Sequence, residues 1–360
     1  MSERVFIPGE DDEAVLLLRA KVWGADHRFT NAAYYKWLFH DTPDGPGAGI
    51  VSEKDGKVIG FAGLSHRKGQ SGNNPIRIAH GLDFMVDPGL PGMLSGRVAI
   101  RVVHAHLKLV VARGFDCSLN YPNNNSHRML VSKRAQFETV FEPDLYVRPL
   151  SAIRLSPDET PNAGKRAAVR LGAAFGAAYS GIRSIGASRD MEIDILDGFD
   201  ERFDRLWPRL QADGKLRFTR DARTLNWRYF DHPVASYKVF AAIRNGDVEG
   251  YIVTCAREIL GADARLICDF MVAGQQRDVQ ETLLSTAIDA ARREGAELVA
   301  TQMISHDGAM PALKRLGFVR VPARFNPKAF RMAAVRCSEK DDVIMQGANW
   351  SFRWGDMDVV

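Results

Sequence analysis

The chain has 360 residues, a length that accommodates about two domains of ordinary size. Its composition, 46% apolar and 26% charged, is typical of a globular protein and excludes a fibrous or disordered chain. The net charge of +4 is small for this length, so we expect no nucleic-acid partner. The cysteines have no paired spacing, which predicts free thiols in a reducing compartment and neither a zinc site nor a disulfide framework: Cys117, Cys255, Cys268 and Cys337.

The N-terminal stretch carries charges where an export signal needs an apolar core, so we expect a cytoplasmic protein. Apolar residues recur at helical spacing over residues 12–24 and 31–40, which predicts two amphipathic helices. Two strands are expected next, over residues 50–53 and 57–64. The Asp-Gly pair between them is a strong hairpin signal.

The rest of the first half alternates strand and helix. A strand over residues 76–86 leads through a glycine- and proline-containing loop into a long helix over residues 95–114, which ends at a glycine. A strand over residues 115–121 and the polar loop 122–127 follow. A short helix and a last strand over residues 135–141 complete the predicted unit.

The second half repeats landmarks of the first half in the same order. The segment around Trp37 has a counterpart around Trp227, and each segment precedes two apolar runs joined by a turn. Further matching pairs are residues 82–86 with 268–272, and residues 135–141 with 316–322. The spacing, roughly 180 to 190 residues, predicts two copies of one domain and not a solenoid, whose period is about 20 to 50 residues.

The residues between the two halves differ in composition from both. Residues 151–166 are rich in Ser, Pro, Gly and charge, and they cannot bury enough apolar surface to order alone. A helix is expected over residues 167–185, where two arginines favour a linker over a membrane-associated helix. The predicted division is therefore a first domain over residues 1–150, a linker over 151–190 and a second domain over 191–360.

This order of elements resembles the GNAT family of acetyltransferases, in two tandem copies. The aromatic segments at Trp37 and Trp227, the strand 82–86 and the loop 122–127 are similar to tandem-GNAT proteins found with polysaccharide biosynthesis. The resemblance implies an α/β fold with mixed sheets, built as two GNAT acyl-CoA N-acyltransferase domains joined by a helical linker. It also implies acetyl-CoA as co-substrate.

In the family, the pyrophosphate of acetyl-CoA lies on the loop and helix start that follow the strand equivalent to residues 82–86. The matching loop here keeps Gly92 and Gly96, but Pro91 and Leu94 depart from the family pattern. The second copy has Gly274 without a following glycine, so the cofactor is assigned to the first domain. The alternative is that the two glycines mark only a turn and a close helix contact. By resemblance, the cofactor-binding residues are Phe84, Met85, Val86, Gly92, Met93, Ser95, Gly96, Arg97 and Asn125.

Four side chains are candidates for the proton transfers that acyl transfer to an amine requires. Asp83 lies on the strand next to the expected substrate amine, yet it has a counterpart, Asp269, in the second copy, so a structural role is equally open. His80 has a suitable unperturbed pKa, although a lone strand histidine is more often structural. Neither copy has the family's tyrosine general acid in the helix after the polar loop, and Tyr121 is a candidate substitute, with His127 as another.

The resemblance makes an amine the acceptor, with an amino sugar, a sugar nucleotide or another polysaccharide precursor as candidates. Two other functions stay open: a catalytically silent scaffold that binds acyl-CoA or a protein, and an aminoacyl-tRNA-dependent transferase of the peptidoglycan-bridge group. The C-terminal run 349–356 carries two tryptophans and is expected to fold into the cleft between the domains or to pack against the second domain. No metal is expected, since His104 and His106 point to different faces of a helix.

Overall fold

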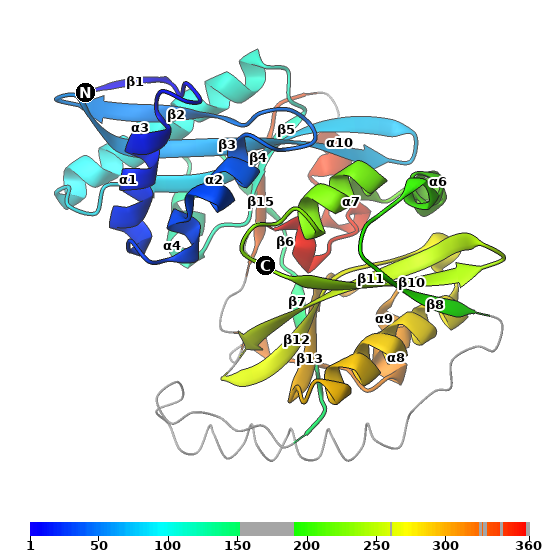
Figure 1. Cartoon of the computed structure of the whole chain (residues 1–360). Coiled ribbons are helices and arrows are strands. Elements are labelled where there is room, and N and C mark those ends of the chain that lie inside the picture. The colour runs from blue at the N-terminus through cyan, green and yellow to red at the C-terminus, as the bar shows by residue number, and fades with distance from the viewer. Residues whose placement is uncertain (152–190, 260, 324–325, 327–329, 339–340, 358–360) are drawn as a thin grey trace.

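We describe a computed structural model of the chain, which covers residues 1–151, 191–259, 261–323, 326, 330–338 and 341–357. The helix expected over residues 167–185 lies outside these ranges. Two mixed sheets form the framework, and the blue and cyan half of the chain lies beside the green to orange half (Figure 1). The predicted α/β class with mixed sheets is therefore confirmed.

The first sheet has the order β1-β2-β3-β4-β5-β15-β6, and β9 pairs with β3. All neighbours are antiparallel except β4 and β5, which are parallel. Its strands are β1 Ser2–Val5, β2 Ala48–Lys54, β3 Lys57–Ser71, β4 Asn74–Val86, β5 Cys117–Asn120, β6 Glu138–Phe141, β9 Leu216–Phe218 and β15 Met332–Arg336.

The second sheet has the order β14-β7-β13-β12-β11-β10-β8, and its parallel pair is β12 and β13. Its strands are β7 Asp144–Pro149, β8 Glu192–Leu196, β10 Tyr237–Arg244, β11 Asp247–Ile259, β12 Ala262–Val272, β13 Leu298–Met303 and β14 Val319–Arg320. The run β4-β5-β15-β6 of the first sheet thus corresponds to the run β12-β13-β7-β14 of the second.

Each sheet takes one inner strand from the other half of the chain. Strand β7 follows β6 in sequence but inserts between β13 and β14, whereas β15 from the C-terminal half inserts between β5 and β6. These two inner strands, together with β9 of the second half on β3, therefore cross the division that the sequence predicts between residues 1–150 and 191–360. Local patterning did not predict either strand, because an alternating run of five or six residues does not specify its partner.

Helices pack on the sheets, so that the apolar faces of the sheets lie in the core. The helices are α1 Asp12–Trp23, α2 Ala32–Phe39, α3 Gly92–Ala112, α4 Asn124–Leu130, α6 Glu201–Leu210, α7 Ala222–Tyr229, α8 Arg277–Arg293, α9 Met310–Arg315 and α10 Asp341–Ile344. The long helices α3 and α8 pack on equivalent strands, and their buried stripes include Val98 and Val102 in α3 and Leu283 and Ala287 in α8. None of the described helices combines the length and the hydropathy of a membrane span.

The two repeated aromatic segments meet at the junction of the halves. Trp37 in α2 and Trp227 in α7 stack with ring centroids 4.6 Å apart and planes inclined by 12°. Each indole N–H donates to the other residue's carbonyl, at 2.8 Å from Trp37 and 3.2 Å from Trp227. Such a stack contributes about 0.5–1.5 kcal/mol beyond its buried area, so the equivalent residues of the repeat hold each other in place.

Candidate functional site

The first sheet opens between β4 and β5. The parallel pairing of these strands begins at Ile78 and Cys117 and ends at His80 and Leu119. Beyond this point β4 continues to Val86 and still pairs with β3, while no strand in the described part of the chain lies beside its other edge. Because a strand carries backbone N–H and C=O groups on both edges, the open edge of β4 offers hydrogen bonds to a ligand.

A cavity of about 660 Å³ lies at this opening. Asp83 and Phe84 on β4 and Asn120 and Tyr121 at the end of β5 line it from the first half. The second half contributes the end of β11, one residue of β12, one residue before β15 and one of the C-terminal segment: Arg257, Glu258, Ile259, Leu266, Phe330 and Trp354. The volume is in the range of small-molecule sites, and both halves build it.

Asp83 lies at a bulge in β4 and faces a buried arginine. Leu82 pairs with Gly63 and Met85 with Phe61, so Asp83 and Phe84 together lie opposite a single residue of β3. Asp83 has the left-handed φ of 49°, which a short polar residue tolerates better than others. Its carboxylate accepts a hydrogen bond from Arg19 Nη1, and Arg19 is fully buried. These contacts favour the structural role of Asp83 over that of a general base.

Tyr121 lines the same cavity. Its ring packs edge-on to His80, with centroids 5.7 Å apart, and against Phe352 at 5.6 Å. The hydroxyl is buried and has no hydrogen-bond partner among the described residues. Burial raises the pKa of Tyr121 well above its usual value. A phenol that stays protonated and lacks a partner is suited to donate a proton to a bound substrate.

His80 does not line this cavity. Its side chain is 2% exposed and borders a small internal void of about 10 Å³ together with Arg67, Trp227 and Arg228. Burial, followed by the charges of Arg67 and Arg228, lowers the pKa of His80 to about 3. The structure thus brings Asp83 and Tyr121 together and places His80 behind the sheet opening.

The start of α3 carries the two glycines that the sequence singles out. Helix α3 begins at Gly92 with Pro91 as its N-cap, and no side chain caps its first N–H groups. Neither Gly92 nor Gly96 has a positive φ, and a Cβ at either position meets no atom within 4 Å. Glycine inside a helix costs about 1 kcal/mol relative to alanine. Neither a turn nor a close contact among the described residues explains why glycine stands at these two positions. A ligand lying against the helix start would explain it.

A second hollow, of about 1480 Å³, lies along this helix start. Gly92, Met93, Gly96 and Arg97 line it, and Lys133 and Arg134 supply further positive charge from beyond α4. Helix α4 borders both the hollow and the cavity, since its residue Met129 lines the hollow and its residue Leu130 lines the cavity. Met93 is 89% exposed, a large apolar side chain left open to a ligand.

The other predicted cofactor residues lie around the opening. Phe84 lines the cavity, Met85 is buried in the core, and Val86 and Ser95 are partly exposed. Asn125 lies in α4 and not in a loop, because the side chain of Asn123 accepts hydrogen bonds from the N–H groups of Asn125 and Ser126 and so starts the helix there. The Asn125 side chain is exposed.

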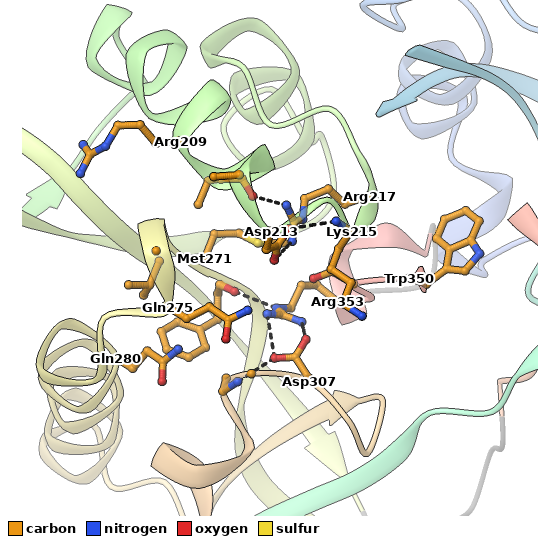
Figure 2. A pocket seen from close by; sticks show the side chains of 18 of the residues that line it. Arg209, Asp213, Lys215, Arg217, Met271, Gln275, Gln280, Asp307, Trp350 and Arg353 are labelled. Atoms are coloured by element: carbon orange, nitrogen blue, oxygen red, sulfur yellow. Dashed lines mark hydrogen bonds and ion pairs between the residues drawn. The ribbon is translucent and has the colours of Figure 1, made fainter. Parts of the chain in front are cut away.

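The second sheet opens in the same way between β12 and β13, but a side chain occupies part of the strand edge there. Pairing ends at Ile267 and Thr301. The free edge of β12 is then occupied by Arg353, whose Nε donates to the carbonyl of Phe270 at 2.7 Å (Figure 2). Asp307 accepts from Arg353 Nη1 at 2.5 Å and holds the guanidinium in place. Gly274 here has a φ of 60°, so the backbone itself requires this glycine.

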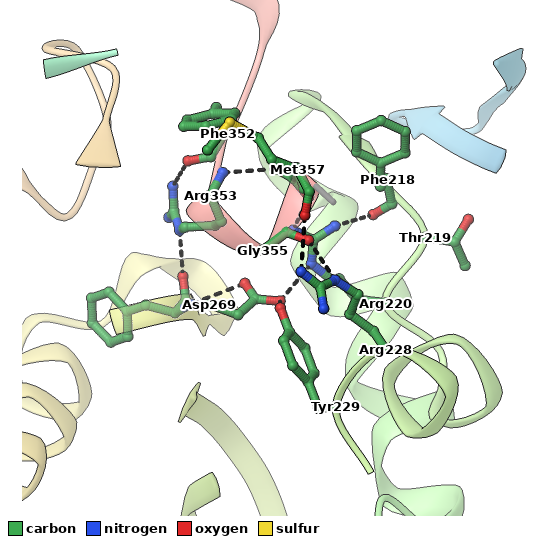
Figure 3. A network of polar contacts seen from close by, with 12 residues as sticks. Phe218, Thr219, Arg220, Arg228, Tyr229, Asp269, Phe352, Arg353, Gly355 and Met357 are labelled. Carbon is green, nitrogen blue, oxygen red and sulfur yellow. Dashed lines mark hydrogen bonds and ion pairs between the residues drawn. The ribbon is translucent and has the colours of Figure 1, made fainter. Parts of the chain in front are cut away.

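Buried arginines fix the C-terminal segment that supplies Arg353 (Figure 3). Arg228 donates to the carbonyls of Gly355 and Met357, both at 2.9 Å. Arg220 lies 3.0 Å from the Asp269 carboxylate and 2.5 Å from that of Asp356. The segment therefore lies between the halves, as one of the two alternatives from the sequence predicts, and it reaches both openings through Trp350 and Trp354.

Residue patterns assigned no role in this site to Asn120 or Arg257, whereas Trp354 lies in the C-terminal run that one of the two sequence alternatives places between the domains. The Asn120 carboxamide oxygen lies 2.1 Å from the point where a Cβ of Gly81 would be, so the Asn120 side chain closes the apex of the opening. Arg257 and Trp354 come from the other half, and only the strand exchange and the return of the C-terminal segment bring them here. The one local signal is a charged pair, Arg257 and Glu258, at the end of an otherwise apolar strand.

Solved structures of acetyltransferases are similar to nearly the whole chain. A GCN5-related N-acetyltransferase from Anabaena variabilis has a TM-score of 0.65 at 10% identity, covering 96% of this chain and 75% of that one. One from Kribbella flavida has a TM-score of 0.60 at 14% identity, covering 96% and 74%. Eis1 from Mycobacterium abscessus has a TM-score of 0.57 at 10% identity, covering 96% and 75%. No family model matches the sequence, and no curated protein does.

At such low identity the likeness concerns the fold alone. The chain has the fold of the GCN5-related N-acetyltransferases, as the sequence predicts. Within this fold, the open edge of β4 is the place in this chain where a ligand has room beside a strand.

Proposed function

We propose that the protein transfers an acetyl group from acetyl-CoA to an amine bound in the cavity at the opening between β4 and β5. The observation that carries this proposal is the contrast in strand edges. The edge of β4 beyond His80 faces a cavity of about 660 Å³, while the equivalent edge of β12 is bonded to Arg353. We further propose a cytoplasmic location, which fits four cysteines that form no disulfide among the described residues.

The residues of the first half fit acetyl-CoA in two places. The backbone of Phe84, Met85 and Val86 would hold the thioester end along the open strand edge. The uncapped start of α3, from Gly92 to Gly96, would hold the pyrophosphate, since a helix start with free N–H groups attracts anions. Arg97 in the first turns of α3 adds positive charge along the same hollow. Ser95 lies in the first turn of α3, and Asn125 lies in α4, whose residue Met129 lines the hollow.

Acetyl-CoA supplies a thioester carbonyl, to which the amine forms the new C–N bond as the C–S bond breaks. Backbone N–H groups on β4 would stabilise the charge on the carbonyl oxygen. Tyr121 would protonate the departing sulfur and recover a proton from the amine nitrogen, which loses one as the amide forms; its phenol is protonated and has no partner in the described chain. Asp83 would act as a positioning residue that fixes the bulge through Arg19.

The cavity wall favours an acceptor that carries an anionic group. Arg257 lines the cavity, and its Nε and Nη2 are buried without a hydrogen-bond partner among the described residues. A buried guanidinium that lacks a partner is costly unless a ligand supplies one. Trp23, Phe29 and Trp354 provide flat apolar surfaces nearby. Among the acceptors suggested by the resemblance, these features favour a sugar nucleotide over a neutral amino sugar.

Calorimetric titration of the full chain with acetyl-CoA tests the proposal. We expect one site per chain, lost in Gly92→Glu, because the new carboxylate would lie where the pyrophosphate binds while meeting no protein atom within 4 Å. Ala112→Glu adds the same charge at the exposed far end of α3 and should bind normally. Unchanged binding in Gly92→Glu would refute the placement of the cofactor.

The silent-scaffold function remains the second candidate. Pro91 and Leu94 interrupt the loop, and the position of the family's tyrosine after α4 holds Ser132. Release of free CoA in the presence of an amine acceptor separates the two functions, since a scaffold binds without turnover. A requirement for aminoacyl-tRNA in the same assay would instead support the third function.

A further inference from the structure

A second cavity, of about 330 Å³, lies at the start of α8 in the other half of the chain (Figure 2). The segment 209–217, the connection between β13 and α9, and the C-terminal segment enclose it. Its charged lining residues are predominantly basic: Arg209, Lys215, Arg217, Arg353, Asp213 and Asp307. We infer that this cavity binds a small metabolite carrying a phosphate group, a function separate from acyl transfer.

Both carboxylates of the lining are already paired with arginines. Asp213 accepts from Arg217 at 2.7 Å, and Asp307 accepts from Arg353 at 2.5 Å. Lys215 donates to the carbonyl of Ala348 at 2.7 Å and has no carboxylate partner in the described ranges. Two of its ammonium hydrogens are thus available, and the cavity retains an uncompensated positive charge.

A buried donor points to the same ligand chemistry. Arg217 is 4% exposed, and its Nε has no hydrogen-bond partner within the part of the chain that the structure describes. An anion in the cavity would supply the missing acceptor, and a charge-assisted hydrogen bond of this kind is roughly twice as strong as a neutral one. Arg353 is different, because its nitrogens are bonded to protein oxygens.

The start of α8 adds a third attraction for an anion. This helix has 17 residues, and no side chain caps its first turn. Gly274, Gln275 and Gln280 line the cavity around that start. The acidic residues of the first turns are engaged elsewhere, Asp278 with Arg244 and Glu281 with Arg277 at 2.8 Å. Free N–H groups at a helix start bind phosphate oxygens.

The size and shape of the cavity exclude a long ligand. Arg353 takes the Phe270 carbonyl, which is the strand-edge group that an extended pantetheine chain would need. Trp350 and Ser351 line the same side. The cavity has half the volume of the one at the first opening, so a short phosphate ester fits and acetyl-CoA does not.

Calorimetric titration with glycerol 3-phosphate and with inorganic phosphate tests the inference. We expect binding by the full-length protein at millimolar or lower ligand, weakened at least about tenfold in Lys215→Gln. Gln280→Leu, which removes a neutral donor, should weaken binding less. Lys238→Gln is the matched control, because Lys238 lies on β10 and pairs with Glu294 outside the cavity.

The same titrations separate this site from the hollow beside α3. Gly92→Glu should bind glycerol 3-phosphate as tightly as the unmodified protein, and Lys215→Gln should bind acetyl-CoA normally. Succinate should bind more weakly than phosphate. Absence of phosphate binding at 20 mM, or equal affinity in Lys215→Gln at an unchanged melting temperature, would overturn the inference, and tighter binding of succinate would overturn the phosphate assignment.

Discussion

The two sheet openings begin from the same architecture and differ in what fills them. In the first, the edge of β4 faces a cavity, and the helix that follows starts with glycines that nothing in the protein requires. In the second, Arg353 occupies the edge of β12, and the glycine after it is required by its own backbone conformation. The strand arrangement shared by the two sheets therefore determines the opening. The capacity to hold a long ligand depends instead on a few side chains.

The largest effect should come from the two buried carboxylates, Asp83 and Asp269, which occupy equivalent sequence positions in β4 and β12. Asp83→Asn leaves Arg19 without a carboxylate, and breaking a buried pair costs about 3–5 kcal/mol. Asp269→Asn should cost less, because Arg220 keeps Asp356 at 2.5 Å. Urea unfolding of both variants measures the difference. The hydroxyls of Tyr229 and Tyr251 donate to the Asp269 carboxylate at 3.0 and 3.1 Å. A larger loss for Asp269→Asn would show that these two hydrogen bonds matter more than the contact with Arg220.

The next effect concerns Tyr121, which contributes an unpartnered hydroxyl to the first opening. Tyr121→Phe keeps the packing and removes the proposed proton donor, so kcat should fall about 10²-fold while acetyl-CoA affinity is unchanged. The control is Tyr35→Phe, because the Tyr35 hydroxyl donates to Asp12 at 2.8 Å and Tyr35 does not line the cavity. This variant should retain activity. Full activity in Tyr121→Phe would assign the proton to water or to another group.

The smallest effect is a difference in pH dependence between the two openings. His80 lies behind the first, and Leu266 is its equivalent behind the second. With a folded-state pKa of about 3 against about 6.5 in the unfolded chain, protonation of the unfolded state removes stability as pH falls below about 6.5. The slope from one histidine is about 1.4 kcal/mol per pH unit. Unfolding between pH 7 and 4.5 should therefore be less pH-dependent in His80→Leu; identical slopes would contradict a neutral buried imidazole.

Much of the fold follows from local sequence patterns. Hairpin β2–β3, strand β4 and helix α3 were predictable, because Asp-Gly turns, apolar runs and a terminal glycine specify them locally. The site was predictable only where it lies on those elements, as with Asp83 and Gly92. Arg257 and Trp354 reach it from residues more than 170 positions away from Asp83, and the plug at Arg353 depends on where the C-terminal segment returns. No local period encodes such long-range placement.

The strand exchange has a consequence for how the protein is made. Strand β5 at residues 117–120 can gain its neighbour β15 only after residue 336 has been synthesised, so the first sheet cannot be completed on the ribosome until almost the whole chain has emerged. Until then β5 and β6 present bare edges, which chaperones would need to shield from aggregation. A truncated gene encoding either half alone would yield a sheet that lacks an inner strand.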